Sequence, residues 1–262
     1  MTASLLARDI TLGYGDSPII SRLSVEVPSD SLPLFTGPTA CGKSTLLRGF
    51  ARLLRPTAGA VLLDGTELRS LKPKEAARKL GLLPQSSLAP DGITVADLVG
   101  RGRFPHQSAM RTWSGADERA VSAAMAATGV TELSRRLVDE LSGGQRQRVW
   151  VAMALAQQTR HLLLDEPTTF LDIAHQIDLM ELFADLHRGG TTVVAVLHDL
   201  NHAARYATHL VAMRDGAIVA QGDPREIITA ELVQAVYDLP CTVITDPVSG
   251  TPLVLPLGRR TP

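Results

Sequence analysis

The chain alternates between short apolar stretches and longer amphipathic segments, with turn residues between them. Near the N-terminus, residues 4–11 and 19–27 have the pattern of strands, split by the turn sequence Gly13 to Asp16. We expect further short strands at residues 32–36, 61–63, 162–164, 193–197, 210–213, 217–220, 241–245 and 251–255. Helical spacing of apolar side chains predicts helices at residues 46–54, 116–128, 173–187 and 201–208.

The middle of the chain differs from the rest. Between about residues 88 and 157 the strand signals stop and helical signals dominate. Outside this block strands alternate with helices, a pattern typical of an α/β fold with a mainly parallel sheet. We therefore predict a parallel α/β core into which a helical block is inserted.

Composition and charge narrow the functional classes. With 262 residues, 45% apolar and 20% charged, the chain can bury a sizeable core, which excludes a disordered chain or a disulfide-stapled miniprotein. The net charge of −1 argues against a nucleic-acid partner held by bulk charge. The longest apolar run has eight residues, whereas a membrane span needs about 20, and we expect neither a span nor a signal peptide. Two cysteines make no disulfide framework and fit a reducing cytosol.

A glycine-bearing loop follows the strand predicted at residues 32–36. Residues 37–45, GPTACGKST, match the pattern G-x-x-x-x-G-K-[ST] between a strand and a helix, which is the context that this phosphate-binding motif requires. Successive backbone N–H groups there can cradle a phosphate chain, Lys43 can reach the β- and γ-phosphates, and the Ser44 hydroxyl can ligate Mg²⁺. The alternative is a glycine turn that only feeds a helix. The scarcity of lysine, with four against 22 arginines, makes that alternative weaker.

Two acidic residues end the strand predicted at residues 162–164. The sequence is LLLDEP, so Asp165 and Glu166 lie where ligands bind in parallel α/β sheets. Because side chains alternate along a strand, one carboxylate can face Mg²⁺ and the other an attacking water. The alternative is a strand that ends in acidic turn residues, which becomes less plausible beside a phosphate loop.

The segment LSGGQRQR, residues 141–148, is the most specific one in the chain. Ser142 and Gln145 form the pattern of a helix capping box. Gly143 and Gly144 in a first helical turn cost about 1 kcal/mol each. This cost is explained if another molecule must approach the backbone closely. An exposed helix N-terminus can also bind an anion. The alternative is simply a well-capped helix.

Together these segments resemble the ATP-binding subunit of ABC transporters over essentially the whole chain. The Walker A loop at 37–45, LSGGQ at 141–145 and LLLDEP at 162–167 stand in the order and spacing of that family. Three weaker elements also fit: Tyr14 resembles the aromatic that stacks on adenine, Gln85 the Q-loop glutamine, and His198 the switch histidine. Taken singly, each would pass for a turn, loop or strand-end residue.

The resemblance implies a fold and a division of the chain. We expect an α/β P-loop NTPase core of the ABC ATPase type, with a mainly parallel sheet, an N-terminal antiparallel β subdomain and an inserted α-helical subdomain. The single ATP-binding domain would span residues 1–262. Its catalytic core with the β subdomain would comprise residues 1–87 and 158–262, and the helical subdomain with the signature motif residues 88–157.

The resemblance also implies roles for residues. Two copies would face each other head to tail with MgATP between them, Glu166 would polarise the attacking water, and Asp172 would bridge the copies. The expected catalytic residues are Glu166, His198, Lys43 and Gln85, and the expected metal ligands are Ser44, Gln85 and Asp165. The expected nucleotide-binding residues are Tyr14, Gly37, Pro38, Thr39, Ala40, Cys41, Gly42, Lys43, Ser44, Thr45, Ser142, Gly143, Gly144, Gln145 and Asp172.

Other stretches resemble one subgroup of this family. Residues 102–106, 167–172 and 198–201 are similar to importers of ferric siderophores, haem and cobalamin, and residues 211–257 look most like those of the ferric-enterobactin type. The implied function is ATP hydrolysis coupled to uptake of an iron(III)-siderophore or related chelate. The implied partners are a second copy, integral membrane permease subunits and, indirectly, a substrate-binding protein, with the chain peripheral on the cytoplasmic membrane face. Phe104, Pro105, Met110 and Trp113 would supply apolar surface toward the membrane partner.

The sequence departs from the family at Thr39 and Ala40, where glycine is usual at the second position. If position 40 needs a positive φ, alanine strains the loop by about 1–2 kcal/mol. Cys41 is either a regulatory thiol or a small residue that fits.

Three rival interpretations remain. A soluble ABC ATPase of the repair or translation type usually brings tandem cassettes, coiled coils or basic surfaces, whereas a P-loop kinase lacks LSGGQ. A zinc pair at His198 and His202 lacks the glutamate of H-E-x-x-H and an evident third ligand.

Overall fold

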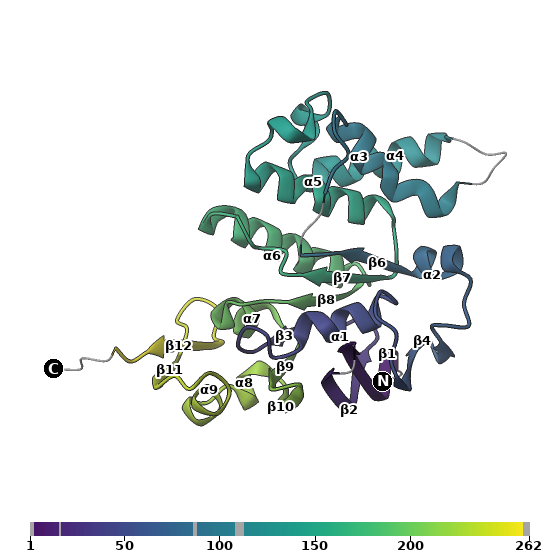
Figure 1. Cartoon of the computed structure of the whole chain (residues 1–262). Coiled ribbons are helices and arrows are strands. Elements are labelled where there is room, and N and C mark those ends of the chain that lie inside the picture. Colours follow the sequence, from purple (N-terminus) through teal and green to yellow (C-terminus); the bar gives the residue numbers. More distant parts are fainter. Residues whose placement is uncertain (1–2, 16, 86–87, 108–112, 259–262) are drawn as a thin grey trace. The chain divides into compact units, whose positions relative to one another are not determined.

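The computed structural model describes residues 3–15, 17–85, 88–107 and 113–258 (Figure 1). It divides into two compact units: unit 1 comprises residues 1–70 and 194–262, and unit 2 comprises residues 71–193. This division concerns compactness alone, and the predicted domain limits at 1–87, 88–157 and 158–262 stay predictions. Asp16 of the predicted first turn and Met110 lie outside the described residues.

The N-terminal part of unit 1 is an antiparallel sheet. Strand β1 (Ala3–Tyr14) pairs antiparallel with β2 (Ser17–Pro28) on one side and β4 (Ala58–Leu63) on the other, and the short β5 (Thr66–Glu67) pairs antiparallel with β4 at the edge of the sheet. Alternate residues of β2 are buried, as expected for a sheet with one covered face. The antiparallel β subdomain expected from the resemblance is therefore confirmed.

The second sheet of unit 1 carries the phosphate loop. Strand β3 (Pro33–Thr36) lies parallel to β8 (Thr192–Val196) and β9 (His209–Arg214), and β9 turns back antiparallel into β10 (Ala217–Gly222). Every residue of β3 and β8 is buried, the pattern of a parallel strand covered on both faces. Helix α1 (Lys43–Phe50) follows the loop after β3. The rings of Phe35 and Phe50 meet edge to face with their centroids 6.5 Å apart, which fastens α1 to the sheet.

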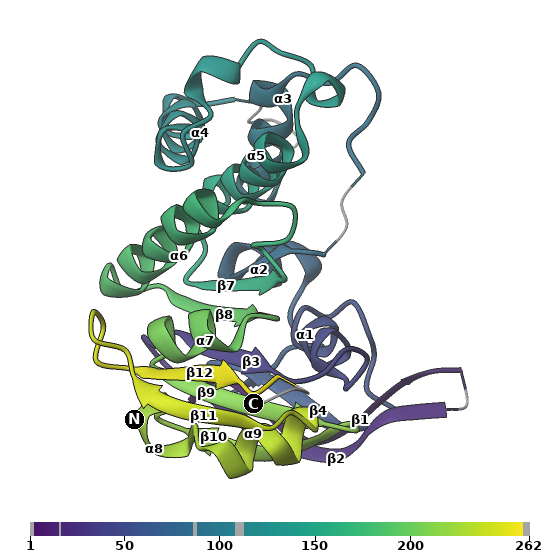
Figure 2. The same ribbon diagram turned by 90° about the vertical axis from the view of Figure 1, so that its left-hand side faces the viewer.

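The end of the chain forms a segment of its own in unit 1, residues 224–257, called here the C-terminal segment. It consists of α8 (Pro224–Ile227), α9 (Ala230–Tyr237) and a hairpin of β11 (Cys241–Thr245) and β12 (Pro252–Pro256). The hairpin lies along α7 (Leu200–Tyr206), as Figure 2 shows. The side chain of Asn201 holds it there, since Nδ2 donates to Val254 O at 3.2 Å and Oδ1 accepts from Val254 N at 2.8 Å.

Unit 2 combines a parallel strand pair with a group of helices. Strands β6 (Leu80–Leu83) and β7 (His161–Asp165) pair in parallel, α2 (Pro73–Lys79) precedes β6, and α6 (Ile173–Arg188) follows β7. Strand β6 is an addition, because we predicted no strand there. The helices α3 (Val95–Gly100), α4 (Gly115–Ala127) and α5 (Gly143–Ala156) pack together, with 3-10 turns at Arg101–His106, Thr131–Leu133 and Val138–Glu140 (Figure 1). The predicted α/β fold with an inserted helical subdomain is confirmed.

A buried charge holds the helices of unit 2 together. Arg103 is only 5% exposed, and its guanidinium donates to Asp117 Oδ1 at 2.8 Å and to the carbonyl of Ala156, the last residue of α5, at 2.7 Å. Hydrogen bonds from Ser114 and then from Arg103 lower the pKa of Asp117 to about 2, so the pair is ionised at neutral pH. Arg103 is thus a structural residue, whereas its neighbour Phe104 is 70% exposed.

Within the described residues, no helix combines the length and the apolarity that crossing a membrane requires.

Candidate nucleotide site

The loop between β3 and α1 has the backbone of an anion cradle. Its φ angles are positive at Gly37 (147°), Ala40 (63°) and Gly42 (105°), which turns successive amides to one side. Gly42 is the N-cap of α1 and has no side chain to occupy the first free amides of the helix. Lys43 Nζ donates to the carbonyls of Gly37 and Pro38, both at 2.8 Å. The predicted strand–loop–helix is present, and its donors suit a phosphate chain.

This loop rests on the turn between β9 and β10. A Cβ at Gly37 would lie 2.1 Å from the backbone oxygen of Met213, so only glycine fits there. The amide of Gly216 donates to Cys41 O at 3.0 Å and ties the middle of the loop to the same turn. Cys41 itself is buried, with Lys43 Nζ 3.5 Å from its Sγ.

Two other predicted residues of unit 1 lie at loop ends. Tyr14, at the end of β1, is 49% exposed, and its hydroxyl accepts from Arg48 Nη1 at 2.7 Å, which fixes the ring while leaving much of it exposed. His198 is exposed between β8 and α7. The next residue, Asp199, caps α7 by accepting from the amides of Asn201 and His202.

Unit 2 brings together two residues that we predicted on separate grounds. Gln85 Nε2 donates to Glu166 Oε2 at 2.7 Å. Asp165 and Glu166 are both buried at the end of β7, and Glu166 has a φ of 53° in the left-handed region. A non-glycine residue in this region costs free energy, and such positions concentrate at functional sites.

The signature segment, residues 141–145, starts α5 with a full capping box. Ser142 Oγ accepts from the amide of Gln145 at 3.3 Å, and Gln145 Oε1 accepts from the amide of Ser142 at 3.1 Å. Ser142 and Gly143 are exposed. Because the Ser142 hydroxyl accepts in this box, its own proton is left to donate outward.

Comparison with known proteins decides the family. The model of the ABC transporter family matches residues 20–169. This chain belongs to the ABC transporter family. It is 55% identical over 261 residues to the ferric enterobactin transport ATP-binding protein FepC of Escherichia coli (strain K12), covering 99% of this chain and 96% of that protein.

Solved structures agree with this assignment. A structure described as a metal-chelate type ABC transporter in an inward-facing conformation superposes with a TM-score of 0.84 at 27% identity, covering 99% of each chain. A dimeric ATP-binding cassette in a post-hydrolysis state, bound to ADP and Pi, superposes with a TM-score of 0.74 at 26% identity, covering 84% of this chain and 98% of that one. The predictions of an ABC ATPase and of its fold are confirmed, and the individual site residues stay predictions.

Asp172, another predicted residue of this ABC ATPase, is the N-cap of α6. Its Oδ1 accepts from the amide of His175 at 2.9 Å and lies 2.7 Å from His175 Nδ1. These hydrogen bonds lower the pKa of Asp172, so the exposed carboxylate stays charged. It therefore combines a local capping role with an outward-facing charge.

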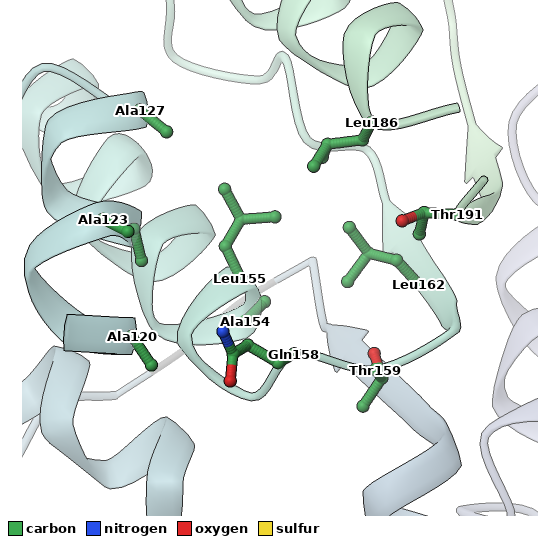
Figure 3. Close-up of a pocket in the computed structure, with 11 residues that line it drawn as sticks. Ala120, Ala123, Ala127, Ala154, Leu155, Gln158, Thr159, Leu162, Leu186 and Thr191 are labelled. Carbon is green, nitrogen blue, oxygen red and sulfur yellow. The ribbon is translucent and has the colours of Figure 1, made fainter. Parts of the chain in front are cut away.

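An apolar pocket of about 410 Å³ lies in unit 2 apart from all of these predicted site residues (Figure 3). Leu155 of α5, Leu162 of β7 and Leu186 of α6 point into it, with alanines of α4 along one side. Its lining has no titratable side chain, so the pocket offers no acid–base chemistry.

One contact near the Walker A loop is not indicated by any sequence pattern. The hydroxyl of Tyr237, the last residue of α9, shares a hydrogen bond with Thr36 Oγ1, directly before the loop. The two residues are 201 positions apart, and no motif contains Tyr237, so no sequence signal indicated this contact.

Proposed function

We propose that this chain hydrolyses MgATP as a subunit of an importer, and that the imported cargo is an iron(III)-siderophore or a related haem or cobalamin chelate. The similarity to the ferric enterobactin transport protein over nearly its full length supports this cargo class. The overall match to a metal-chelate type transporter supports it independently. The observation that carries the ATPase chemistry is the bond from the Gln85 amide to the Glu166 carboxylate.

The nucleotide would bind through the Walker A loop. The amides from Thr39 to Thr45 and the Lys43 ammonium would hold the phosphates, and the Tyr14 ring would stack on adenine. Ser44, Asp165 and Gln85 supply the oxygen donors that Mg²⁺ prefers. The bound ion would neutralise phosphate charge and orient the chain of phosphates.

Hydrolysis would depend on Glu166 and its neighbours. The carboxylate orients a water for in-line attack on the γ-phosphorus, and the Gln85 amide fixes the direction of that carboxylate. His198 contacts the γ-phosphate from the loop before α7 and stabilises the charge that develops there.

A second copy would complete the site head to tail. Its Ser142 hydroxyl and the amides of Gly143, Gly144 and Gln145 would donate to the γ-phosphate, and Asp172 would bridge the copies. The dimeric cassette with ADP and Pi supports such a pair. A homodimer, integral permease subunits and a substrate-binding protein are the proposed partners, and the cytoplasmic membrane face is the proposed location. Exposed Phe104 and Trp113 are the surface offered to the permease.

The substitution Glu166→Gln tests the ATPase assignment. Loss of the general base lowers hydrolysis by about 10²–10⁴-fold, whereas ATP binding persists and a dimer accumulates because the closed state is not consumed. Phosphate release and size-exclusion chromatography with MgATP measure the two effects. Glu181→Gln, an exposed carboxylate on α6, is the matched control. Hydrolysis by Glu166→Gln at the parental rate would contradict the assignment.

The cargo needs its own experiment. In proteoliposomes that hold this chain with its permease, a binding protein loaded with ferric siderophore should stimulate ATP hydrolysis more than the unloaded binding protein does. Equal hydrolysis in both cases would remove the cargo from the proposal and leave the ATPase assignment intact.

A further inference from the structure

The C-terminal segment touches the start of the Walker A loop through one side chain. The hydroxyls of Tyr237 and Thr36 share a hydrogen bond, and the backbone of Gly37 lies near the Tyr237 hydroxyl. Thr36 is the last residue of β3 and is fully buried. The Tyr237 hydroxyl therefore lies where β3 ends and the Walker A loop begins.

The position of Tyr237 is fixed from the same strand that supports the loop. Asp238 is the C-cap of α9 and has a φ of 53°. Its carboxylate pairs with Arg214, with Nη2 to Oδ2 at 2.7 Å and Nη1 to Oδ1 at 3.3 Å. Arg214 directly follows Met213, whose carbonyl Gly37 packs against. The end of α9 and the start of the loop thus share β9 as their support.

The tyrosine keeps its proton. Burial, the largest cause, raises the pKa of Tyr237 to about 12, so the hydroxyl is neutral at physiological pH. A neutral hydroxyl donates one hydrogen bond and accepts others, which matches the two groups that face it. Phenylalanine would fill the same space and remove only the hydroxyl with its hydrogen bond to Thr36.

We propose that Tyr237 is a positioning residue for nucleotide binding, which acts by holding the Thr36–Gly37 turn in the conformation that the phosphates require. The proposal rests on the proposed ATPase function. The Lys43 ammonium donates to the carbonyls of Gly37 and Pro38. The orientation of the backbone at Gly37 therefore also sets the position of this ammonium. We expect the backbone of the loop to contribute mainly to ground-state binding of the phosphates, so its loosening should raise KM more than it lowers kcat.

The test compares Tyr237→Phe with the parent in the full-length chain. The Kd for a fluorescent ATP analogue and the KM for ATP should rise by about 2- to 10-fold, since about one hydrogen bond is lost, whereas kcat changes by less than about 2-fold. Tyr206→Phe, which removes the hydroxyl of a tyrosine on α7, is the matched control and should leave the Kd unchanged.

A double-mutant cycle identifies the partner. Thr36→Val removes the other hydroxyl at nearly the same volume, and the double variant should bind the analogue no more weakly than Tyr237→Phe alone. An unchanged Kd in Tyr237→Phe overturns the proposal, and so does a fall in kcat at constant Kd, which a merely structural role would give. Failure of the parent chain to bind the analogue would instead overturn the proposed ATPase function.

Discussion

The Walker A loop and the signature segment both present a helix N-terminus, yet the chain supports them differently. The loop is held from several directions within its own unit, by the carbonyl of Met213, the amide of Gly216 and the hydroxyl of Tyr237. The signature segment is satisfied by its own capping box and is exposed at Ser142 and Gly143. The Walker A loop is thus braced by its own unit before any ligand binds, whereas the start of the signature segment is exposed.

Gly37 of the Walker A loop and Gly143 of the signature segment differ in the same way. A Cβ at Gly37 would lie 2.1 Å from a backbone oxygen, whereas at Gly143 the nearest atom of the described chain would be Phe170 Cβ at 3.6 Å, an ordinary contact. The chain's own packing therefore demands glycine at position 37 but not at position 143. The explanation that another molecule approaches the backbone at position 143 is compatible with this open space and stays a prediction.

The largest effect is expected for Gly37→Ala. The added Cβ collides with Met213 O in a backbone conformation that L-residues rarely adopt, which should cost about 4 kcal/mol or more of unfolding free energy. Urea unfolding followed by circular dichroism measures this loss. Parental stability in this variant would show that the loop is less firmly seated than the contacts indicate.

Arg103→Met tests how the far end of the signature helix is fastened. The substitution leaves Asp117 without its buried partner and frees the carbonyl of Ala156, and it should cost about 3 kcal/mol at neutral pH. Both tryptophans of the chain, Trp113 and Trp150, belong to unit 2, so their fluorescence reports its unfolding.

The loss of unfolding free energy in Arg103→Met should become smaller as the pH falls, because it depends on the ionised Asp117 carboxylate. The folded-state pKa of Asp117, about 2, lies below its ordinary value of 3.8, so its ionisation stabilises the fold above 3.8 and ceases to do so as the pH falls toward 2. The difference in unfolding free energy between parent and Arg103→Met should therefore narrow over that interval. A constant difference would mean that the pair contributes by packing alone.

Gly143→Ala separates folding from assembly. The isolated chain should keep its stability or gain up to about 1 kcal/mol, because alanine favours a helix over glycine. Phosphate release by the assembled transporter should fall by roughly 10- to 100-fold, as expected for loss of a transition-state donor surface. Gly115→Ala is the matched control, since Gly115 also follows a serine N-cap with a capping box, at the start of α4. An equal effect of both substitutions would remove the intermolecular explanation.

The smallest effect is expected for Ala40→Gly. Position 40 has a φ of 63°, which meets the condition stated for strain at this alanine, so glycine should relieve about 1–2 kcal/mol. Titration with a fluorescent ATP analogue should show a gain in affinity of at most about 10-fold. A much larger gain would mean that alanine distorts the loop rather than merely straining it.

Local patterns in the sequence predicted much of the fold and the outline of the site. The strand–loop–helix around Lys43 and the buried strand before Asp165 follow from short-range apolar spacing, and both are present. Strand β6 was missed because α2 runs into it without an intervening turn residue. The burial of Arg103 was missed because its partners, Asp117 and Ala156, are distant in the sequence.

Long-range polar contacts are the part that sequence patterns cannot supply. Tyr237 meets Thr36, and Gln85 meets Glu166, across separations of 201 and 81 residues. Gln85 and Glu166 each belong to a motif of the family, so the sequence indicates both residues but not the contact between them. Tyr237 belongs to no such motif, and only the packing of α9 brings it to the loop.

The two hydrogen bonds between the Asn201 side chain and the Val254 backbone have a consequence for how the C-terminal hairpin docks on α7. A carboxamide carries the same donor and acceptor as a peptide group, so α7 joins the hairpin as though it contributed one more strand residue. Aspartate has nearly the same shape but sets an oxygen against the carbonyl of Val254, and leucine offers neither group. A single substitution at position 201 would therefore remove both hydrogen bonds between α7 and the hairpin and weaken its docking, while the hairpin's own strand pairing stays unchanged.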